Sequence, residues 1–228
     1  MNKFFENKPR YRNPVKVVDE IDWLQGTYGV EFVVLGDLTF GGPRAMQVCD
    51  ELLARNIKVA WWAQTRADAI VDGLVVLDKM REAGCVQVAI GIEHGAQGQL
   101  DQFGKGIKVN DTIEACALAK QAGLSVQGYF MIGGPGETQE SALSTINLMD
   151  WMLQKRLVDI THISIAVPYP GTDLYANPEN YGYTLISRDF SEYFMNCDAF
   201  GAGLPVYETE KLSRYELYVL WEHALATA

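Results

Sequence analysis

Five short apolar runs that alternate with helical patterns, at a spacing of about 30 residues, restrict most strongly what this chain can fold into. The runs are rich in Val, Ile, Phe and Trp and occupy residues 30–36, 57–63, 86–92, 125–132 and 159–166. Strands that alternate with helices in this way are typical of βαβ units, and hence of a parallel sheet covered by helices. Because all five runs are nearly continuously apolar, we expect strands that are covered on both faces.

Start and stop signals mark the helices between these runs. Helix starts are predicted where a capping residue stands next to a proline or an acid, at Asn13-Pro14, Gly42-Pro43 and Asn110-Asp111. Left-handed C-caps are expected at Gly26 or Gly29, at Gly84 and at Gly123. After the fifth run the alternation stops, and a terminal helix is predicted from about residue 209 to about residue 224.

Composition and charge exclude several classes of function. The 29 acidic residues outnumber the 19 basic residues and give a net charge of −10, so we expect neither nucleic acid nor a membrane as a partner. A cytoplasmic, reducing location is expected, because the four cysteines lie far apart, form no C-x-x-C pair and follow no secretory leader. Three of them are interpreted as small buried apolar side chains and the fourth lies in a less regular segment: Cys49, Cys85, Cys116 and Cys197.

Polar residues follow the predicted strands at the edge where ligands bind in βα folds, because loops and helix N-termini converge there. Besides the glycine-rich turn after the fourth run, these candidate binding residues are Asp37, Gln64, Arg66, Glu93, His94 and Tyr169. A ligand-facing role is favoured for Glu93, since a carboxylate at the end of an apolar strand is costly unless it is paired or meets solvent or a ligand. For His94 two interpretations stay open, a bond to a ribose hydroxyl or a satisfied polar side chain. Arg66 could bind a ligand carboxylate or form an ion pair with Asp68 or Asp72.

The run Gly133-Gly134-Pro135-Gly136 lets a ligand approach the backbone closely and exposes amides at a helix start. Such a run suits an anion or a planar heterocycle, and taken alone it also fits an ordinary tight turn. No Gly-Lys-Ser/Thr follows it, and no G-x-G-x-x-G opens a first βαβ unit, so phosphate-loop and dinucleotide-binding interpretations are excluded. The sequence has no metal-ligand spacing and no G-x-S-x-G nucleophile turn, and we assign no catalytic residue.

Together, the segments at the strand ends resemble the core of the radical S-adenosylmethionine superfamily, in its cobalamin-associated branch of methyltransferases and anaerobic tetrapyrrole cyclases. They read Gly91-Ile-Glu-His-Gly-Ala-Gln97, then Gly128-x-Phe-x-Ile-Gly-Gly-Pro-Gly-Glu-Thr138, then Pro168-Tyr-Pro-Gly-Thr172. The resemblance extends over about residues 4–175. It implies an α/β fold, a partial (β/α)6 TIM-like barrel that lacks its first strand. Residues 1–13 would form a basic arm, residues 14–175 the partial barrel, and residues 176–228 a C-terminal extension with a terminal helix.

The resemblance also implies a cofactor, S-adenosylmethionine. The adenine would be supported by Gly133, Gly134, Pro135, Gly136 and Glu137. Glu93 and its neighbours would face the ribose or methionine part, Arg66 would lie near the methionyl carboxylate, and Asp37 matches the acidic end of the second strand.

The family's 4Fe-4S cluster is held by a C-x-x-x-C-x-x-C loop that should precede Phe4, and the sequence contains no such loop. We therefore expect a truncated core that is inactive alone, with any cobalamin supplied by a further domain. Two alternatives stay open, a non-catalytic nucleotide-binding or partner subunit and an unrelated βα-barrel enzyme. The expected partners are a small-molecule substrate and, at the exposed edge of strand 30–36, either the missing N-terminal part or an oligomeric partner.

Overall fold

The computed structural model describes residues 11–37, 39–193 and 204–227. The chain folds as two compact units, one formed by Met1–Gly91 with Asp111–Gln127 and the other by Ile92–Asn110 with Gly128–Ala228. The boundary between the units falls within two strands, β3 (Cys85–Glu93) and β4 (Ser125–Ile132). The domain boundaries expected after residues 13 and 175 stay a prediction.

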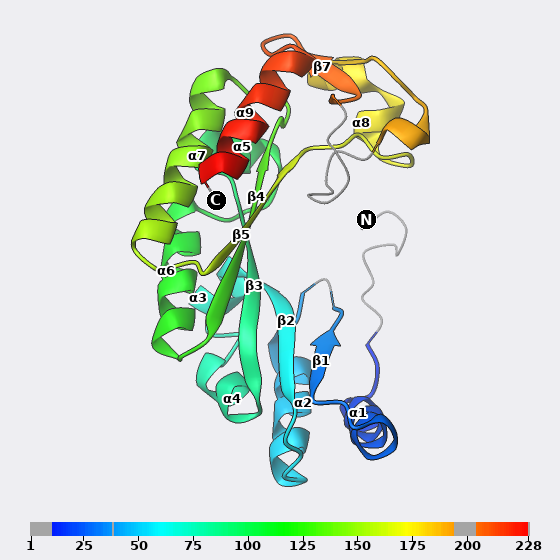
Figure 1. The fold of residues 1–228 in the computed structure, drawn as a ribbon, viewed down its shortest axis with the longest axis vertical. Coiled ribbons are helices and arrows are strands. Elements are labelled where there is room, and N and C mark those ends of the chain that lie inside the picture. Colours follow the sequence, from blue (N-terminus) through cyan, green and yellow to red (C-terminus); the bar gives the residue numbers. More distant parts are fainter. Residues whose placement is uncertain (1–10, 38, 194–203, 228) are drawn as a thin grey trace. The chain divides into compact units, whose positions relative to one another are not determined.

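Five strands form one sheet in the order β1-β2-β3-β4-β5, which is also their order along the chain (Figure 1). The remaining strands are β1 (Phe32–Leu35), β2 (Ala60–Arg66) and β5 (Ile160–Ile165). Parallel pairing sets Val34 beside Trp62 and Thr65 beside Ile90. The predicted fold class is thereby confirmed: an α/β fold in which parallel strands are covered by helices, as in partial (β/α) barrels.

Helices connect and follow the strands. Their bounds are α1 (Pro14–Tyr28), α2 (Gly42–Ala54), α3 (Ala67–Val71), α4 (Leu77–Glu82), α5 (Gln97–Gln102), α6 (Val109–Gln121), α7 (Gln139–Gln154), α8 (Asp173–Ala176) and α9 (Arg214–Thr227). The start expected at Asn13-Pro14 is confirmed, because the Asn13 side chain accepts a hydrogen bond from Val15 N–H. The same helix is followed by Gly29 as its left-handed C-cap, which has φ +65° and donates its N–H to Gln25 O.

Burial of the strands differs from the expectation. In β2 and β4 every second residue is buried and the residues between are half-exposed, so the prediction that these strands are covered on both faces is wrong. The half-exposed face also carries large side chains such as Trp62, Tyr129 and Met131, and the sequence therefore reads as continuously apolar. The pattern of these strands identifies them as strands but does not reveal which face is covered.

The C-terminal part adds a small antiparallel hairpin, β6 (Tyr183–Leu185) and β7 (Tyr207–Thr209), and two short 3-10 helices, η2 (Pro178–Tyr181) and η3 (Phe190–Glu192). The terminal helix begins at Arg214, later than the predicted residue 209, because Thr209 is the last residue of β7. Ser213 and Glu216 bond each other's backbone N–H groups reciprocally and so define the start of α9. Trp221 on α9 donates its indole N–H to Ile163 O of β5 (3.0 Å), which fixes the helix against the sheet.

Candidate functional site

The glycine-rich turn connects β4 to α7 in the second unit. Gly133 and Gly136 have φ values of +79° and +69°, a conformation that favours glycine. Thr138 then caps α7: its hydroxyl accepts from Ser141 N–H, and the Ser141 side chain accepts from Thr138 N–H in return. The local sequence thus sets both the sharp turn and the helix start that follows it.

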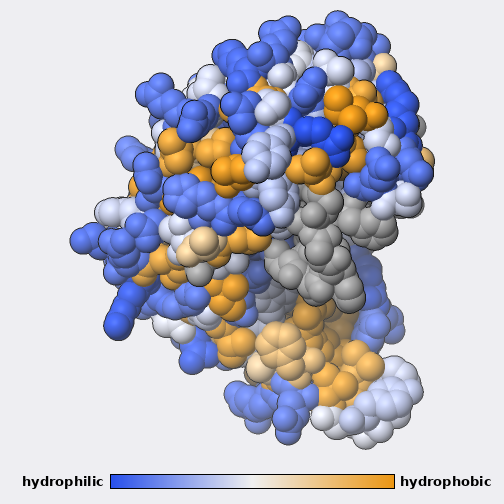
Figure 2. All heavy atoms as spheres, turned by 45° about the horizontal axis from the view of Figure 1, so that its top comes forward, coloured by the Kyte–Doolittle hydropathy of each residue, from blue (hydrophilic) through white to orange (hydrophobic). Residues whose placement is uncertain are grey.

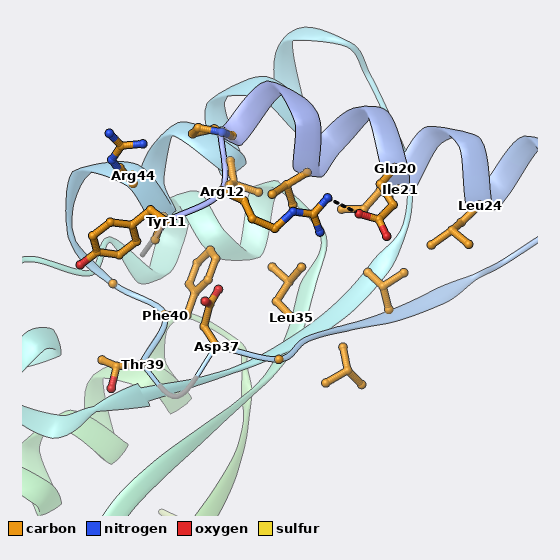
Figure 3. Close-up of a pocket in the computed structure, with 18 of the residues that line it drawn as sticks. Tyr11, Arg12, Glu20, Ile21, Leu24, Leu35, Asp37, Thr39, Phe40 and Arg44 are labelled. Carbon is orange, nitrogen blue, oxygen red and sulfur yellow. Dashed lines mark hydrogen bonds and ion pairs between the residues drawn. The ribbon is translucent and has the colours of Figure 1, made fainter. Parts of the chain in front are cut away.

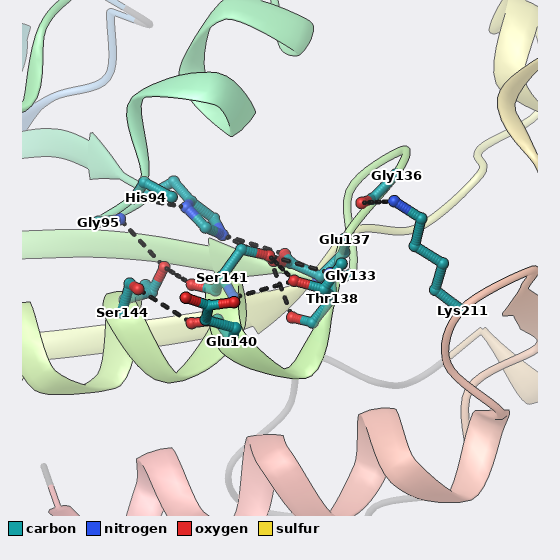
Figure 4. Close-up of polar contacts among 12 residues, drawn as sticks. His94, Gly95, Gly133, Gly136, Glu137, Thr138, Glu140, Ser141, Ser144 and Lys211 are labelled. Carbon is teal, nitrogen blue, oxygen red and sulfur yellow. Dashed lines mark hydrogen bonds and ion pairs between the residues drawn. The ribbon is translucent and has the colours of Figure 1, made fainter.

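A buried carboxylate, that of Glu137, organises this turn (Figure 4). Its Oε2 accepts from Gly133 N–H (3.0 Å) and from His94 Nε2 (3.0 Å), while Ser141 Oγ–H donates to its Oε1. The side chains of His94 and Glu137 are both 0% exposed. A carboxylate this deeply buried is tolerated only when its oxygens are bonded, and here three donors converge on it.

The tautomer of His94 follows from its two partners. Nδ1 accepts from Ala96 N–H (3.0 Å), so it carries no proton, and Nε2 is the nitrogen that donates to Glu137. Both ring nitrogens are therefore used within the protein. Of the two interpretations of His94, the geometry favours the satisfied polar side chain, which ties the end of β3 to the turn. A direct ligand contact stays a prediction.

Close packing surrounds the turn. A Cβ on Gly134 would collide with the ring of Phe103, so this side chain lies directly against the turn. Gln99 on α5 is 5% exposed, and its Oε1, which has no hydrogen-bond partner among the described residues, lies 3.1 Å from the position of that Cβ. The turn thus has an unsatisfied acceptor beside it, which the protein encloses in this conformation.

Glu93 ends β3 with φ +67°, one of the positive-φ non-glycine residues in the described part of the chain. Its carboxylate pairs with Lys105 Nζ (2.8 Å), and the two side chains are 18% and 34% exposed. Backbone strain of this kind is often retained at functional sites. The carboxylate can accept hydrogen bonds from the two hydroxyls of a ribose, which agrees with the ligand-facing role favoured from the sequence.

The first unit holds Asp37, Gln64 and Arg66. Asp37 lines a cavity of about 620 Å³ between α1, β1 and the start of α2 (Figure 3). Gln64 is half-buried, and its backbone carbonyl accepts a hydrogen bond from Phe40 N–H (2.6 Å). Arg66 donates through Nε and Nη2 to the carboxylate of Asp68 (2.9 and 2.7 Å), and the arginine lowers the pKa of Asp68. The ion-pair alternative for Arg66 is therefore present in the structure.

Tyr169 follows β5 in the second unit and is 49% exposed, and its carbonyl accepts from Thr172 N–H (3.1 Å). Among the predicted site residues, the structure joins His94, Gly133 and Glu137 directly through hydrogen bonds. Sequence reasoning missed Phe103, Gln99, Ser141 and the residues that contact the turn from the C-terminal hairpin. Only Ser141 belongs to a local pattern, since it stands at the third position of α7 after the capping Thr138. The role of the predicted residues in cofactor binding stays a prediction.

Three cysteines lie on separate elements, α2, β3 and α6, and are buried and free: Cys49, Cys85 and Cys116. Burial raises the pKa of each thiol to about 12, so they are protonated and their interpretation as apolar side chains is confirmed. Cys197 lies outside the described residues.

Within residues 11–37, 39–193 and 204–227, no group of three or more His, Cys, Asp or Glu side chains could hold a metal ion. The described residues therefore do not fit a 4Fe-4S cluster, which needs convergent thiolates. In the same part of the chain, no helix has the length and apolar character needed to cross a membrane.

Comparisons with known proteins bear on this site. Residues 1–149 match the family described as Radical SAM superfamily. An anaerobic magnesium-protoporphyrin IX monomethyl ester cyclase of Cereibacter sphaeroides is 31% identical over 213 residues, which make up 91% of this chain and 32% of that protein. An uncharacterized methyltransferase of Pyrococcus horikoshii is 31% identical over 191 residues, or 82% of this chain and 40% of that protein. The chain thus spans only 32% and 40% of the length of these two curated relatives.

Solved structures share the fold. TsrM from Kitasatospora setae, a radical S-adenosylmethionine methyltransferase solved with cobalamin and a [4Fe-4S] cluster bound, aligns with a TM-score of 0.70 and 17% identity. The alignment covers 95% of this chain and 46% of that chain. OxsB, a cobalamin-dependent S-adenosylmethionine radical enzyme solved with aqua-cobalamin bound, aligns with a TM-score of 0.53 and 20% identity, over 73% of this chain and 25% of that chain.

Proposed function

The chain belongs to the radical SAM superfamily, as its motifs predicted, and from this membership we propose that its second unit binds S-adenosylmethionine through Glu93 and the turn from Gly133 to Gly136. The observation that carries the proposal is the buried Glu137 network, which holds a glycine-rich backbone in one conformation in the same unit as a strained, half-buried carboxylate. Glu93 would accept hydrogen bonds from the ribose hydroxyls, and the turn would support the adenine.

In this family, a 4Fe-4S cluster supplies the electron that cleaves the sulfonium of S-adenosylmethionine. Because the described residues offer no site for it, we propose that the ligands of the cluster come from another segment or subunit. The activity of the assembled protein would then be a radical methylation or ring formation on a small-molecule substrate, as the names of the relatives indicate for those proteins. Any cobalamin would likewise bind outside the described residues.

Calorimetry tests the binding function directly. Titration of the purified chain with S-adenosylmethionine should give saturable binding, and Glu93→Gln should weaken it by about tenfold or more, since hydrogen bonds to a charged group contribute about 1.5–3 kcal/mol. Asp101→Asn, at an exposed position on α5, is the matched control and should leave the affinity unchanged. Binding that cannot be detected at millimolar ligand would refute the proposal.

A non-catalytic nucleotide-binding subunit is the second candidate, and the three protonated thiols on separate elements favour it. Anaerobic reconstitution of the chain with iron and sulfide distinguishes the two. A subunit without cluster ligands should bind S-adenosylmethionine but retain no stoichiometric iron and release no cleaved nucleotide. Stoichiometric cluster absorbance together with nucleotide cleavage would overturn this second candidate.

The edge of the sheet at β1 is the place where we propose a partner binds. β1 is the terminal strand of the sheet, and Phe32 and Val34 on it are 49% and 58% exposed. Figure 2 shows hydrophobic side chains gathered at the surface in the lower part of the view, and the exposed hydrophobic residues of the first unit include Tyr11, Val15, Trp23 and Tyr28 as well. An extended apolar segment that pairs with β1 would bond the backbone groups at this edge of the sheet and pack beside Phe32 and Val34.

A further inference from the structure

Two tyrosines from the C-terminal hairpin contact the glycine-rich turn at one atom. The carbonyl oxygen of Gly133 accepts from Tyr207 O–H (2.8 Å) and also from Tyr183 O–H. The two tyrosines lie 50 and 74 residues beyond Gly133 in the sequence and are 3% and 1% exposed. A carbonyl has two lone pairs, so these phenols satisfy it fully.

The hairpin brings the two rings together by its register. Tyr183 pairs with Thr209, and Leu185 pairs with Tyr207, so the tyrosines are diagonal neighbours on one face. Their rings stack with centroids 4.5 Å apart and an interplanar angle of 11°. The stack is a rigid platform that presents both hydroxyls to the same acceptor.

The fit at Gly133 is steric as well as polar. A Cβ at this position would collide with the Tyr207 hydroxyl and would lie 3.1 Å from a methyl group of Ile165. The N–H of Gly133 is bonded to the Glu137 carboxylate on its other side (3.0 Å). At the end of the run, Lys211 from the segment after β7 donates to Gly136 O (3.3 Å) (Figure 4). The C-terminal hairpin and the residues after it therefore hold the turn near both of its ends.

Because the peptide bond is planar, the contact with the Gly133 carbonyl also constrains the orientation of the next N–H group, that of Gly134. The carbonyl of Gly133 and the N–H of Gly134 belong to one trans peptide unit, in which the two groups point in opposite directions. When the phenols fix the carbonyl, they also fix the direction of Gly134 N–H, away from the tyrosine pair. The backbone donor at the centre of the turn is thus aimed by residues that need not touch a ligand.

We propose that Tyr183 and Tyr207 are positioning residues for the nucleotide site, which orient the peptide between Gly133 and Gly134 so that the turn is held in its binding conformation before the ligand arrives. This inference rests on the proposed binding of S-adenosylmethionine at the turn. The C-terminal hairpin would thereby raise the affinity for the ligand. Because folding already orders the turn, binding does not have to supply the free energy needed to order it.

The test uses phenylalanine, which keeps each ring and removes only the hydroxyl. Tyr183→Phe, Tyr207→Phe and the double variant are compared with Tyr215→Phe, which changes a 65% exposed tyrosine on α9. Two quantities are measured on each protein, the affinity for S-adenosylmethionine by calorimetry and, by NMR without ligand, the amide hydrogen exchange of Gly133, whose N–H is bonded to Glu137. Far-UV circular dichroism and thermal melting establish that each variant is folded.

Each single variant should weaken binding by about three- to tenfold, the range expected for one lost hydrogen bond, and should accelerate exchange at Gly133. The Tyr215→Phe control should change neither quantity. If the wild-type protein binds and the folded double variant binds equally well, the inference is overturned and the proposed function stands. If the wild-type protein does not bind, the proposed function fails, and unchanged exchange in the double variant then overturns the positioning role as well.

A double-mutant cycle keeps the inference testable if the double tyrosine variant does not fold. Gly133→Ala introduces the Cβ that collides with the Tyr207 hydroxyl, and Tyr207→Phe removes that hydroxyl. The alanine should therefore destabilise the wild-type background more than the Tyr207→Phe background. Additive effects of the two substitutions on the melting temperature would contradict direct contact between these groups.

Discussion

Removal of the Glu137 carboxylate is the strongest single perturbation that the site offers. The side chain is fully buried and accepts hydrogen bonds from Gly133 N–H, His94 Nε2 and Ser141 Oγ. Glu137→Ala leaves Gly133 N–H and His94 Nε2–H without an acceptor in a buried site, whereas the Ser141 hydroxyl can still donate to Thr138 O. Glu137→Gln keeps the shape of the side chain and one acceptor oxygen. Its amide N–H₂ would face His94 Nε2–H, which can only donate.

The size of the effect follows from these contacts. Each buried donor left unsatisfied costs about 1–3 kcal/mol, and bonds to a charged acceptor lie at the upper end of what a hydrogen bond contributes. Because the three donors share one carboxylate, their costs do not add fully. We expect Glu137→Ala to lower the free energy of unfolding by about 3–5 kcal/mol and Glu137→Gln by about 2 kcal/mol, a large part of the 5–15 kcal/mol typical of a folded protein.

Urea denaturation followed by circular dichroism measures these changes from the shift of the midpoint at constant slope. Glu140→Gln is the matched control, since Glu140 is exposed in the first turn of α7 and should change stability by less than about 0.5 kcal/mol. Equal midpoints for Glu137→Ala, Glu140→Gln and the wild type would refute the reasoning that the carboxylate holds the turn. A loss in Glu137→Ala with none in Glu137→Gln would assign the effect to side-chain volume instead of hydrogen bonding.

Further expectations concern other parts of the chain. Val34→Lys should shift the protein towards monomer in light scattering, because a charge on the terminal strand opposes pairing with another chain, whereas Leu74→Lys, at a 55% exposed position in the same unit, should not. Gly84→Ala should lower the free energy of unfolding in urea titration by about 3 kcal/mol or more, since Gly84 has φ +98° and its Cβ would collide with Val59 O. The free energy of unfolding should also fall above about pH 9. The three buried thiols have a pKa of about 12 in the folded protein and a lower pKa in the unfolded chain, so their stabilising contribution is complete below the unfolded pKa and is lost as the pH rises towards 12. Replacing one of these cysteines by alanine should reduce the slope of the free energy of unfolding against pH by at most about 1.4 kcal/mol per pH unit. The three positions are Cys49, Cys85 and Cys116.

The alternation of strands and helices could be predicted because the sequence signals for it are local. The fourth strand was predicted at residues 125–132 and observed at Ser125–Ile132, where an apolar run ends directly at a glycine. The start of α1 was equally clear from Asn13 and Pro14. In contrast, β2 begins at Ala60 and not at residue 57, since its first residues are decided by pairing with β1 and β3.

The contacts that hold the site could not be predicted, because they join residues that lie far apart in the chain. His94 and Glu137 are 43 residues apart, and nothing near either one indicates that they meet in a buried pair. The hairpin of β6 and β7 has strands of only three residues, too short for a periodic pattern, and its tyrosines are specified by the acceptor at Gly133. The capping box of Ser213 and Glu216 is visible in the sequence and could have located the start of α9.

Glu93 separates ligand binding from stability more cleanly than the residues of the Glu137 network, whose loss would impair both. At φ +67° an ordinary residue is strained by about 1–2 kcal/mol and glycine is not, while the pair with Lys105 is partly exposed and contributes about 1 kcal/mol or less. Glu93→Ala keeps the strain and Glu93→Gly relieves it, so the glycine variant should be the more stable of the two in urea denaturation, the reverse of the usual order. Both lack the carboxylate and should bind S-adenosylmethionine about tenfold or more weakly in calorimetry. Wild-type affinity in the glycine variant would show that the strain is not retained for the ligand, and an alanine variant more stable than the glycine variant would show that no strain is stored there.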